Sequence, residues 1–109
     1  MEEQSERRIA RNESLFREAN EAIRRGLWPE QQDQLIRFRC ECAYECGQPV
    51  EVSPREYERV RQSGRTFIVL HGHDIPGTEE VVERHPNYLL VRKTGTGGEE
   101  ADRLDPRAD

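Results

Sequence analysis

The three cysteines of this chain fall within seven residues, at Cys40, Cys42 and Cys46, in the run Cys-Glu-Cys-Ala-Tyr-Glu-Cys. An odd number of closely spaced cysteines does not suit a disulfide framework. Thiolates gathered beside a turn are typical of a structural zinc site, which takes four ligands in a tetrahedron. The cluster therefore predicts a metal that ties two parts of the chain together. Buried or loose thiols, and a catalytic or redox cysteine, are the alternative interpretations.

The small size of the chain also favours a metal that links two of its parts. It has 109 residues, of which 33% are hydrophobic and 36% are charged, so it can form one domain with a small core. A small core on a short chain is commonly reinforced by a metal, a disulfide or a partner.

The fourth ligand is expected from a distant loop. His71-Gly72-His73-Asp74 follows the apolar run 66–70, which reads as a buried strand. We favour His73, because it stands clear of the strand end and Asp74 could orient its imidazole. His71 is the second candidate and His85 the third. Zn²⁺ is the expected cofactor and its role structural, with iron left open as the native metal.

Residues 3–25 predict one long amphipathic helix, which ends at Gly26. Its apolar side chains recur at helical spacing and form a stripe. The stripe consists of Ile9, Phe16, Ala19 and Ile23, broadened by Leu15 and Ala22. Two interpretations stay open: the stripe packs on its own domain, or it forms a seam with a second copy or another protein.

The rest of the chain predicts short strands and one capped helix. Residues 35–41 alternate, with Phe38 and Cys40 facing one way and Arg39 and Glu41 the other, and 49–52 could pair with them. Ser53 begins a helix over 54–63. The runs 80–83 and 88–92 predict a hairpin, with a short helix over 78–84 as the competing interpretation.

The predicted fold class is therefore α+β. It comprises an N-terminal amphipathic helix, a small antiparallel sheet, one short capped helix and a zinc clip. The expected division is a helix over 1–26, a zinc-stapled α+β domain over 27–93 and a flexible acidic tail over 94–109, which is glycine-rich and polar.

Charge and hydropathy narrow the possible partners. Seventeen basic and 22 acidic residues give a net charge of -5, which disfavours general nucleic-acid binding. A zinc-ribbon type of nucleic-acid binder would need a local basic surface, for which Arg37, Arg39, Arg55, Arg59 and Arg61 are the candidates. No apolar run approaches the ~18 residues of a membrane span. The acidic start is unlike a signal peptide, so a cytoplasmic location is expected.

Several segments resemble a family of short uncharacterised proteins of GC-rich actinobacteria. The motifs are RNESLFREANEAI (11–23), FRCECAYEC (38–46), VSPREYERVR (52–61), FIVLHGHDIP (67–76), VVERHPNYLLVRK (81–93) and DPR (105–107). In that family the loop usually reads Pro-Gly-His-Glu, which places the family histidine on His73 and makes His71 the departure. The cysteine spacing is one residue shorter here. The resemblance implies a zinc site and brings no enzymatic activity with it.

These observations favour a small non-enzymatic zinc protein that acts as a regulatory protein-interaction module. Its interaction surface is expected at Trp28, Tyr44, Ile9 and Phe16, with another protein or a second copy bound through the N-terminal helix. The alternatives are a zinc-ribbon-like nucleic-acid-binding regulator and a metal- or thiol-dependent enzyme. A closed set of four ligands would count against the enzyme, since catalytic zinc keeps an open position.

Overall fold

The computed structural model describes residues 2–108. The helices are α1 (Glu3–Arg25), α2 (Pro54–Val60) and α3 (Gly95–Arg103), with a 3-10 turn η1 (Pro29–Gln31) after α1. The strands are β1 (Ile36–Arg39), β2 (Pro49–Val52), β3 (Thr66–Val69), β4 (Glu79–Arg84) and β5 (Leu89–Lys93). Within residues 2–108 no helix combines the length and the apolar character needed to cross a bilayer.

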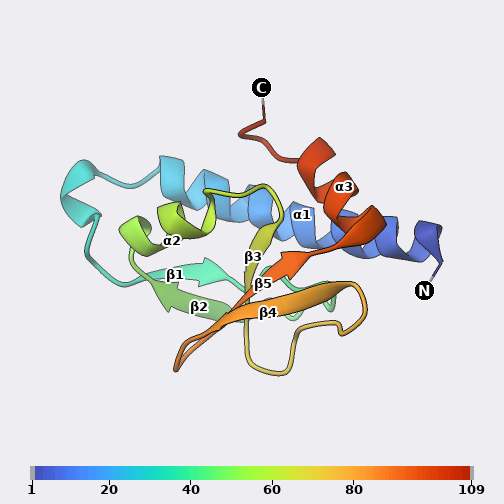
Figure 1. Cartoon of the computed structure of the whole chain (residues 1–109). Helices are drawn as coiled ribbons and strands as arrows, with labels where there is room; N and C mark the ends of the chain where they lie inside the picture. Colours follow the sequence, from blue (N-terminus) through green and yellow to red (C-terminus); the bar gives the residue numbers. More distant parts are fainter. Residues whose placement is uncertain (1, 109) are drawn as a thin grey trace.

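The strands form two small antiparallel sheets, and α1 lies across them (Figure 1). β1 pairs with β2, so that Phe38 lies opposite Val50. The second sheet has the order β3-β5-β4, and its β4–β5 pair is the predicted hairpin. The Glu41 N–H bonds the Ile68 carbonyl oxygen, at 2.8 Å, and so joins the two sheets beside the cysteines. The predicted α+β class is confirmed.

One apolar core lies between the sheets and α2. Phe38 of β1 stacks on Tyr57 of α2, with ring centroids 4.6 Å apart. β3 and β5 add fully buried side chains such as Phe67 and Val91. The start of α2 follows the sequence signals, because the Ser53 hydroxyl accepts a hydrogen bond from the Glu56 N–H at 3.1 Å. The capped helix therefore delivers Tyr57 into the core.

The inward face of α1 is mainly polar. Its buried residues are Ala10, Glu13, Ser14, Arg17, Asn20 and Glu21. The apolar stripe lies beside this face: Ile9, Phe16 and Ile23 are half-buried, and Leu15 is 58% exposed. Ile23 packs against the core. Helical periodicity gave the correct element but did not identify its buried polar face, because α1 packs on backbone groups and charged side chains that need polar partners.

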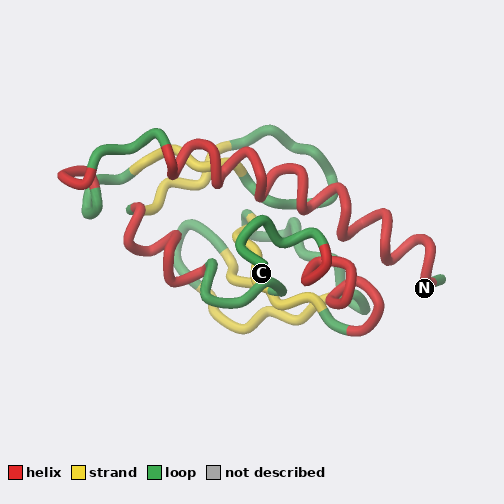
Figure 2. The backbone as a smooth tube through the Cα atoms, turned by 90° about the horizontal axis from the view of Figure 1, so that it is seen from above, coloured by secondary structure: helices red, strands yellow, loops and turns green. Residues whose placement is uncertain are grey.

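The segment expected to be a flexible tail, 94–109, contains the helix α3 over residues 95–103. This helix lies against the N-terminal half of α1 in both views (Figures 1 and 2). Gly98 lets α3 also approach the end of β5 closely: a Cβ at this position would lie 3.0 Å from the Lys93 carbonyl oxygen. Composition suggested flexibility, but the same glycines let α3 pack tightly where larger residues would collide.

Candidate metal centre

The structure brings Cys40, Cys42, Cys46 and His73 together. One potential ligand atom from each residue lies within 4.8 Å of the other three. The cysteines come from the turn that follows β1, and His73 comes from the loop between β3 and β4. The Cys40 Sγ is 3.7 Å from the His73 Nδ1. Tetrahedral zinc, with its usual bond lengths, separates a sulfur from a nitrogen ligand by about 3.6 Å. The arrangement therefore fits a Cys3His metal site.

Backbone N–H groups point at two of the three sulfurs. The Leu70 N–H bonds the Cys40 Sγ at 3.2 Å, and the Gln48 N–H bonds the Cys46 Sγ at 3.4 Å. Donors in this position stabilise negative charge on sulfur, which is the state in which cysteine binds a metal.

The chain reverses sharply to gather these sulfurs. Glu45 has φ 54° and Gly47 has φ 69°, so both residues take left-handed backbone conformations. The turn returns the chain to β2, where the Cys40 N–H bonds the Gln48 carbonyl oxygen at 2.9 Å. A side chain at Gly47 would be strained at this φ, which accounts for glycine directly after Cys46.

Glu41 fixes the cysteine turn from inside the protein. It is fully buried, although alternation placed it on the solvent side with Arg39. Its carboxylate accepts hydrogen bonds from the Tyr57 hydroxyl at 2.8 Å and from the Ile68 N–H at 3.0 Å. The alternation prediction is wrong here because β1 ends at Arg39, so the pleat of the strand no longer sets the direction of Glu41.

Asn20 of α1 holds the same segment from the other side. Its amide bonds the backbone of Arg39 twice, accepting from the N–H at 2.7 Å and donating to the carbonyl at 2.8 Å. It also donates to the Glu41 carboxylate at 2.8 Å. Sequence reasoning missed both positioning residues. The available signals were a glutamate enclosed between two cysteines and an asparagine in the middle of a helix, where it has low propensity.

The three thiols lie in unequal electrostatic surroundings. Burial raises the pKa of the Cys40 thiol, and the neighbouring Cys42 adds to the effect. Burial acts against ionisation of Cys42 too, but hydrogen bonds from the Cys46 backbone and from His73 outweigh it and lower the Cys42 pKa to about 7. Cys42 is therefore the first of the two to become a thiolate, and a bound cation favours the charged form of both.

The other candidate residues lie outside the cluster. The exposed His71 ring contacts the His85 carbonyl oxygen at 2.7 Å, and His85 stacks on Tyr88 with centroids 4.4 Å apart. Asp74 is half-buried, and within residues 2–108 it makes no hydrogen bond to His73. Tyr44 meets the His73 ring edge-on, at 6.0 Å between centroids.

The four residues expected at an interaction surface differ in exposure. Ile9 and Phe16 are half-buried on α1. Trp28 is 73% exposed before η1, and Tyr44 is 60% exposed in the cysteine turn. Whether any of them contacts a partner stays a prediction.

No protein-family model matches this chain, and neither a curated protein nor a solved structure matches it. The resemblance to the actinobacterial proteins therefore stays a prediction that depends on the motifs, of which the cysteine cluster and His73 now have a common place in space.

Proposed function

We propose that this protein is a small zinc-binding, non-enzymatic module that regulates or scaffolds by binding another protein chain, and that its Cys3His zinc is structural. The observation that carries the proposal is the convergence of four potential ligand atoms within 4.8 Å, with a backbone N–H directed at the sulfurs of Cys40 and Cys46. Bound zinc would supply folding energy by joining the cysteine turn to the β3–β4 loop.

A structural role fits the donor set better than a catalytic one. Three cysteines and one histidine fill the four positions of tetrahedral zinc, which leaves none for water or substrate. Cys40 and Cys42 are buried, and the Tyr44 ring covers part of His73. Two grooves, of about 550 and 630 Å³, are lined by none of the four residues.

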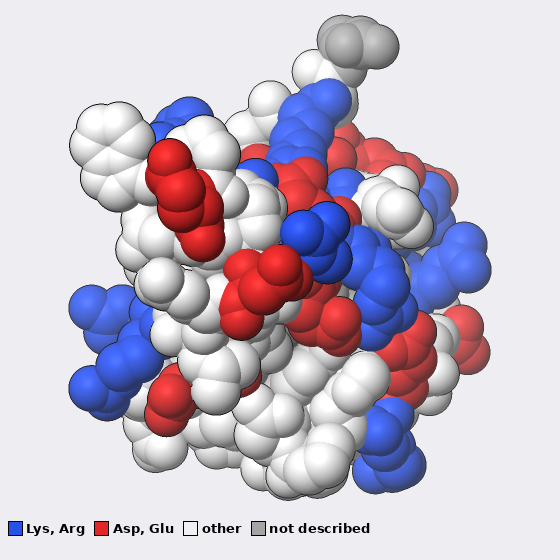
Figure 3. Space-filling view, turned by 90° about the vertical axis from the view of Figure 1, so that its left-hand side faces the viewer, with Lys and Arg blue, Asp and Glu red and all other residues white. Residues whose placement is uncertain are grey.

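The arginines that would serve a nucleic-acid binder are mostly engaged elsewhere. Arg55 and Arg59 form ion pairs with neighbouring carboxylates, and the Arg61 side chain is fully buried. Arg37 and Arg39 are exposed on β1. Figure 3 shows acidic and basic side chains interleaved over one face. Binding to a nucleic-acid duplex requires a continuous basic stripe on the protein. The mixed charges of this surface therefore favour a protein partner.

The metal proposal is tested by native mass spectrometry of the full chain, before and after chelation. We expect one zinc per chain in the parent protein and loss of zinc in His73→Ala. The matched control is His71→Ala, two residues away and outside the cluster, which should keep its zinc. Co²⁺ substitution should produce the absorption bands of a tetrahedral thiolate site.

Two results would overturn the proposal. A folded parent protein that binds neither zinc nor Co²⁺ would return the cysteines to core packing. Equal zinc content in the two histidine variants would remove His73 from the ligand set. Iron in place of zinc would keep the Cys3His site and correct the metal.

A further inference from the structure

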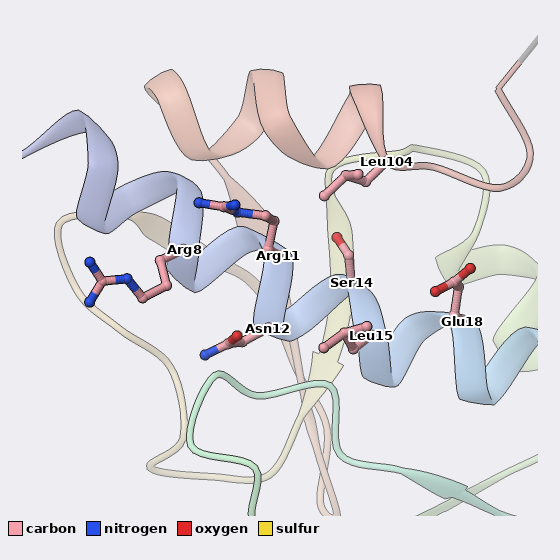
Figure 4. A pocket seen from close by; sticks show the side chains of 7 residues that line it. All are labelled: Arg8, Arg11, Asn12, Ser14, Leu15, Glu18 and Leu104. Carbon is pink, nitrogen blue, oxygen red and sulfur yellow. The ribbon is translucent and has the colours of Figure 1, made fainter.

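A groove of about 550 Å³ runs along α1 between its outward side and the end of α3 (Figure 4). Six residues of α1 line it, and Leu104 stands at its edge where α3 ends; the six are Arg8, Arg11, Asn12, Ser14, Leu15 and Glu18. Leu15 is 58% exposed. The Ser14 Oγ is buried and has no hydrogen-bond partner among the described residues. An apolar side chain beside this groove has therefore been left without a partner from its own chain.

Four of these lining residues stand at positions i, i+3, i+4 and i+7 of one helix: Arg11, Ser14, Leu15 and Glu18. That spacing is the hole of knobs-into-holes packing, in which one side chain of a facing helix enters between four residues. Leu15 has the size and exposure of the knob that such a hole receives. The same surface therefore presents both a knob and a hole.

The charged side chains beside the hole can pair with those of a second copy of α1 that runs antiparallel to the first. Consider an antiparallel pair of α1 helices in which the numbers of two facing residues add up to about 29. Arg11 of one copy then lies opposite Glu18 of the other, and the two-fold symmetry repeats this pair. Glu18 forms no ion pair within residues 2–108, and the contact of Arg11 with Glu100 is long, at 3.8 Å. A parallel pair would set Arg11 against Arg11 and Glu18 against Glu18, which repel.

The sizes of the exposed side chains of α1 also favour an antiparallel pair. The exposed side of α1 is long near its start, at Arg7 and Arg8, and short near its end, at Ala19 and Ala22. An antiparallel pair places the long side chains of one copy over the short ones of the other. A parallel pair places long against long and leaves space at the other end.

We propose that the partner of this surface is a second copy of the same chain, bound through an antiparallel α1–α1 contact with two-fold symmetry. Leu15 of each copy enters the hole formed by Arg11, Ser14, Leu15 and Glu18 of the other. The proposal rests on the proposed function, because it names the partner of that interaction module. A contact made by one helix is small, so we expect a weak dimer with a micromolar dissociation constant, roughly 1–100 μM.

The test is sedimentation equilibrium of the zinc-loaded full chain over about 5–500 μM. We expect a concentration-dependent dimer, and a dissociation constant at least about tenfold higher in Glu18→Arg and in Arg11→Glu, because each single variant sets like charges against each other. An equimolar mixture of the two variants should form a heterodimer, since both facing pairs are then opposite in charge. Glu80→Arg, an exposed reversal on β4, is the matched control and should dimerise like the parent protein.

The outcomes separate this proposal from the zinc proposal. A monomer up to the highest concentration with one zinc per chain overturns the dimer and leaves the zinc site standing. A dimer that Glu18→Arg does not weaken, or variants whose mixture stays monomeric, also overturns it. A dimer without metal supports the α1 contact and overturns the zinc site instead. Circular dichroism of each variant establishes that it is folded before its association is measured.

Discussion

At the scale of single residues, Glu41 is a buried carboxylate that sits between two expected zinc ligands. Three donors converge on it: the Asn20 amide, the Tyr57 hydroxyl and the Ile68 N–H. They come from α1, α2 and β3, so one side chain links three elements to the cysteine turn. Burial raises the Glu41 pKa, and these hydrogen bonds act against that rise.

Glu41→Gln should destabilise the protein and weaken metal binding. The amide nitrogen of glutamine cannot accept a hydrogen bond, so at least one buried donor loses its partner, at a cost of about 1–3 kcal/mol. Zinc affinity should fall about 10–100-fold, as it does when residues that orient a metal ligand are changed. Denaturant unfolding and competition with a zinc-binding dye measure the two effects. Glu45→Gln, exposed in the same turn, should change neither, and equal effects in both variants would contradict the role given to Glu41.

Glu13 belongs to a second buried group, in which two carboxylates share one ammonium. The Lys93 Nζ lies 2.9 Å from the Glu13 Oε1 and 3.0 Å from the Glu79 Oε1, and all three side chains are fully buried. One positive charge cannot balance two negative ones, so one carboxyl keeps its proton. Burial, together with repulsion from Glu79, raises the Glu13 pKa from 4.5 to about 9.

The raised pKa of Glu13 makes the free energy of unfolding depend on pH. The folded protein keeps a proton on Glu13 that the unfolded chain releases above pH 4.5, so the stabilising contribution is complete below that pH and is lost as pH rises towards 9. Between pH 6 and 9, with zinc in excess, the parent protein should lose about 1–3 kcal/mol relative to Glu13→Gln, which carries no titrating proton. Urea unfolding at several pH values measures this difference. Glu3→Gln, exposed on the same helix, should follow the parent curve. A Glu13→Gln curve parallel to that of the parent protein would contradict the assignment.

At the scale of elements, the contact between α3 and the end of β5 depends on the absence of a side chain at Gly98. Gly98 faces the Lys93 carbonyl oxygen and the Arg65 guanidinium, and a Cβ there would lie 3.0 and 2.7 Å from them. The arginine can move, but the carbonyl oxygen belongs to the backbone at the end of β5. A Cβ at this position would therefore require α3 or the end of β5 to shift.

Gly98→Ala should destabilise the protein by about 1–3 kcal/mol, although alanine has the higher helix propensity. The comparison is Glu99→Ala, an exposed position of α3 where the same residue is introduced without a close neighbour. Thermal unfolding should give a lower midpoint for Gly98→Ala and a change within about 0.5 kcal/mol for Glu99→Ala. A stabilised Gly98→Ala would show that propensity outweighs the packing at this contact.

The elements show where sequence reasoning succeeds and where it stops. Local signals placed α1, the Ser53 cap and the hairpin correctly, because each depends on neighbours in the chain. The buried face of α1 and the existence of α3 depend on partners far away in the sequence: the Arg17 side chain donates to the Ala101 carbonyl oxygen, and Arg107 pairs with Glu21. A hydrophobicity pattern cannot report a helix that buries its polar side.

In the candidate metal centre, too, some residues could be assigned from the sequence and others could not. The close spacing of the three cysteines identified them as candidate ligands. His73 was preferred to His71 because it lies farther beyond the end of the strand, and the structure places it with the cysteines. Glu41 and Asn20 could not be assigned, because their roles appear only when α1, α2 and β3 meet. The arrangement of the ligands was predictable from local sequence, whereas the groups that orient the turn were not.

At the scale of the whole molecule, a metal held by Cys40, Cys42, Cys46 and His73 would act as a cross-link over a long loop. Cys40 and His73 are 33 residues apart in sequence, and β2, α2 and β3 lie between them. By the chain-entropy estimate for a cross-link of that length, closing the loop restricts the unfolded chain by about 4 kcal/mol. The radius of gyration, 13.0 Å, equals that of a single compact domain of this length, so the loop belongs to the same body as α1 and α3.

Chelation should therefore destabilise the entire chain, not the cysteine turn alone. We expect the thermal midpoint to fall by roughly 15–30 °C when zinc is removed at neutral pH, and to recover when zinc is returned. Calorimetry with and without chelator makes the measurement, and His71→Ala should respond like the parent protein. An unchanged midpoint after complete removal of the metal would contradict a structural role.

The inward face of α1 has a consequence for how the protein is made. Glu13, Arg17 and Glu21 find their partners at Lys93, Ala101 and Arg107. A ribosome releases α1 first and these partners last, so for most of translation the helix has charged groups that must stay in water. The fold can be completed only after nearly the entire chain has left the exit tunnel, and a nascent chain stalled before residue 93 would remain a substrate for proteases and chaperones.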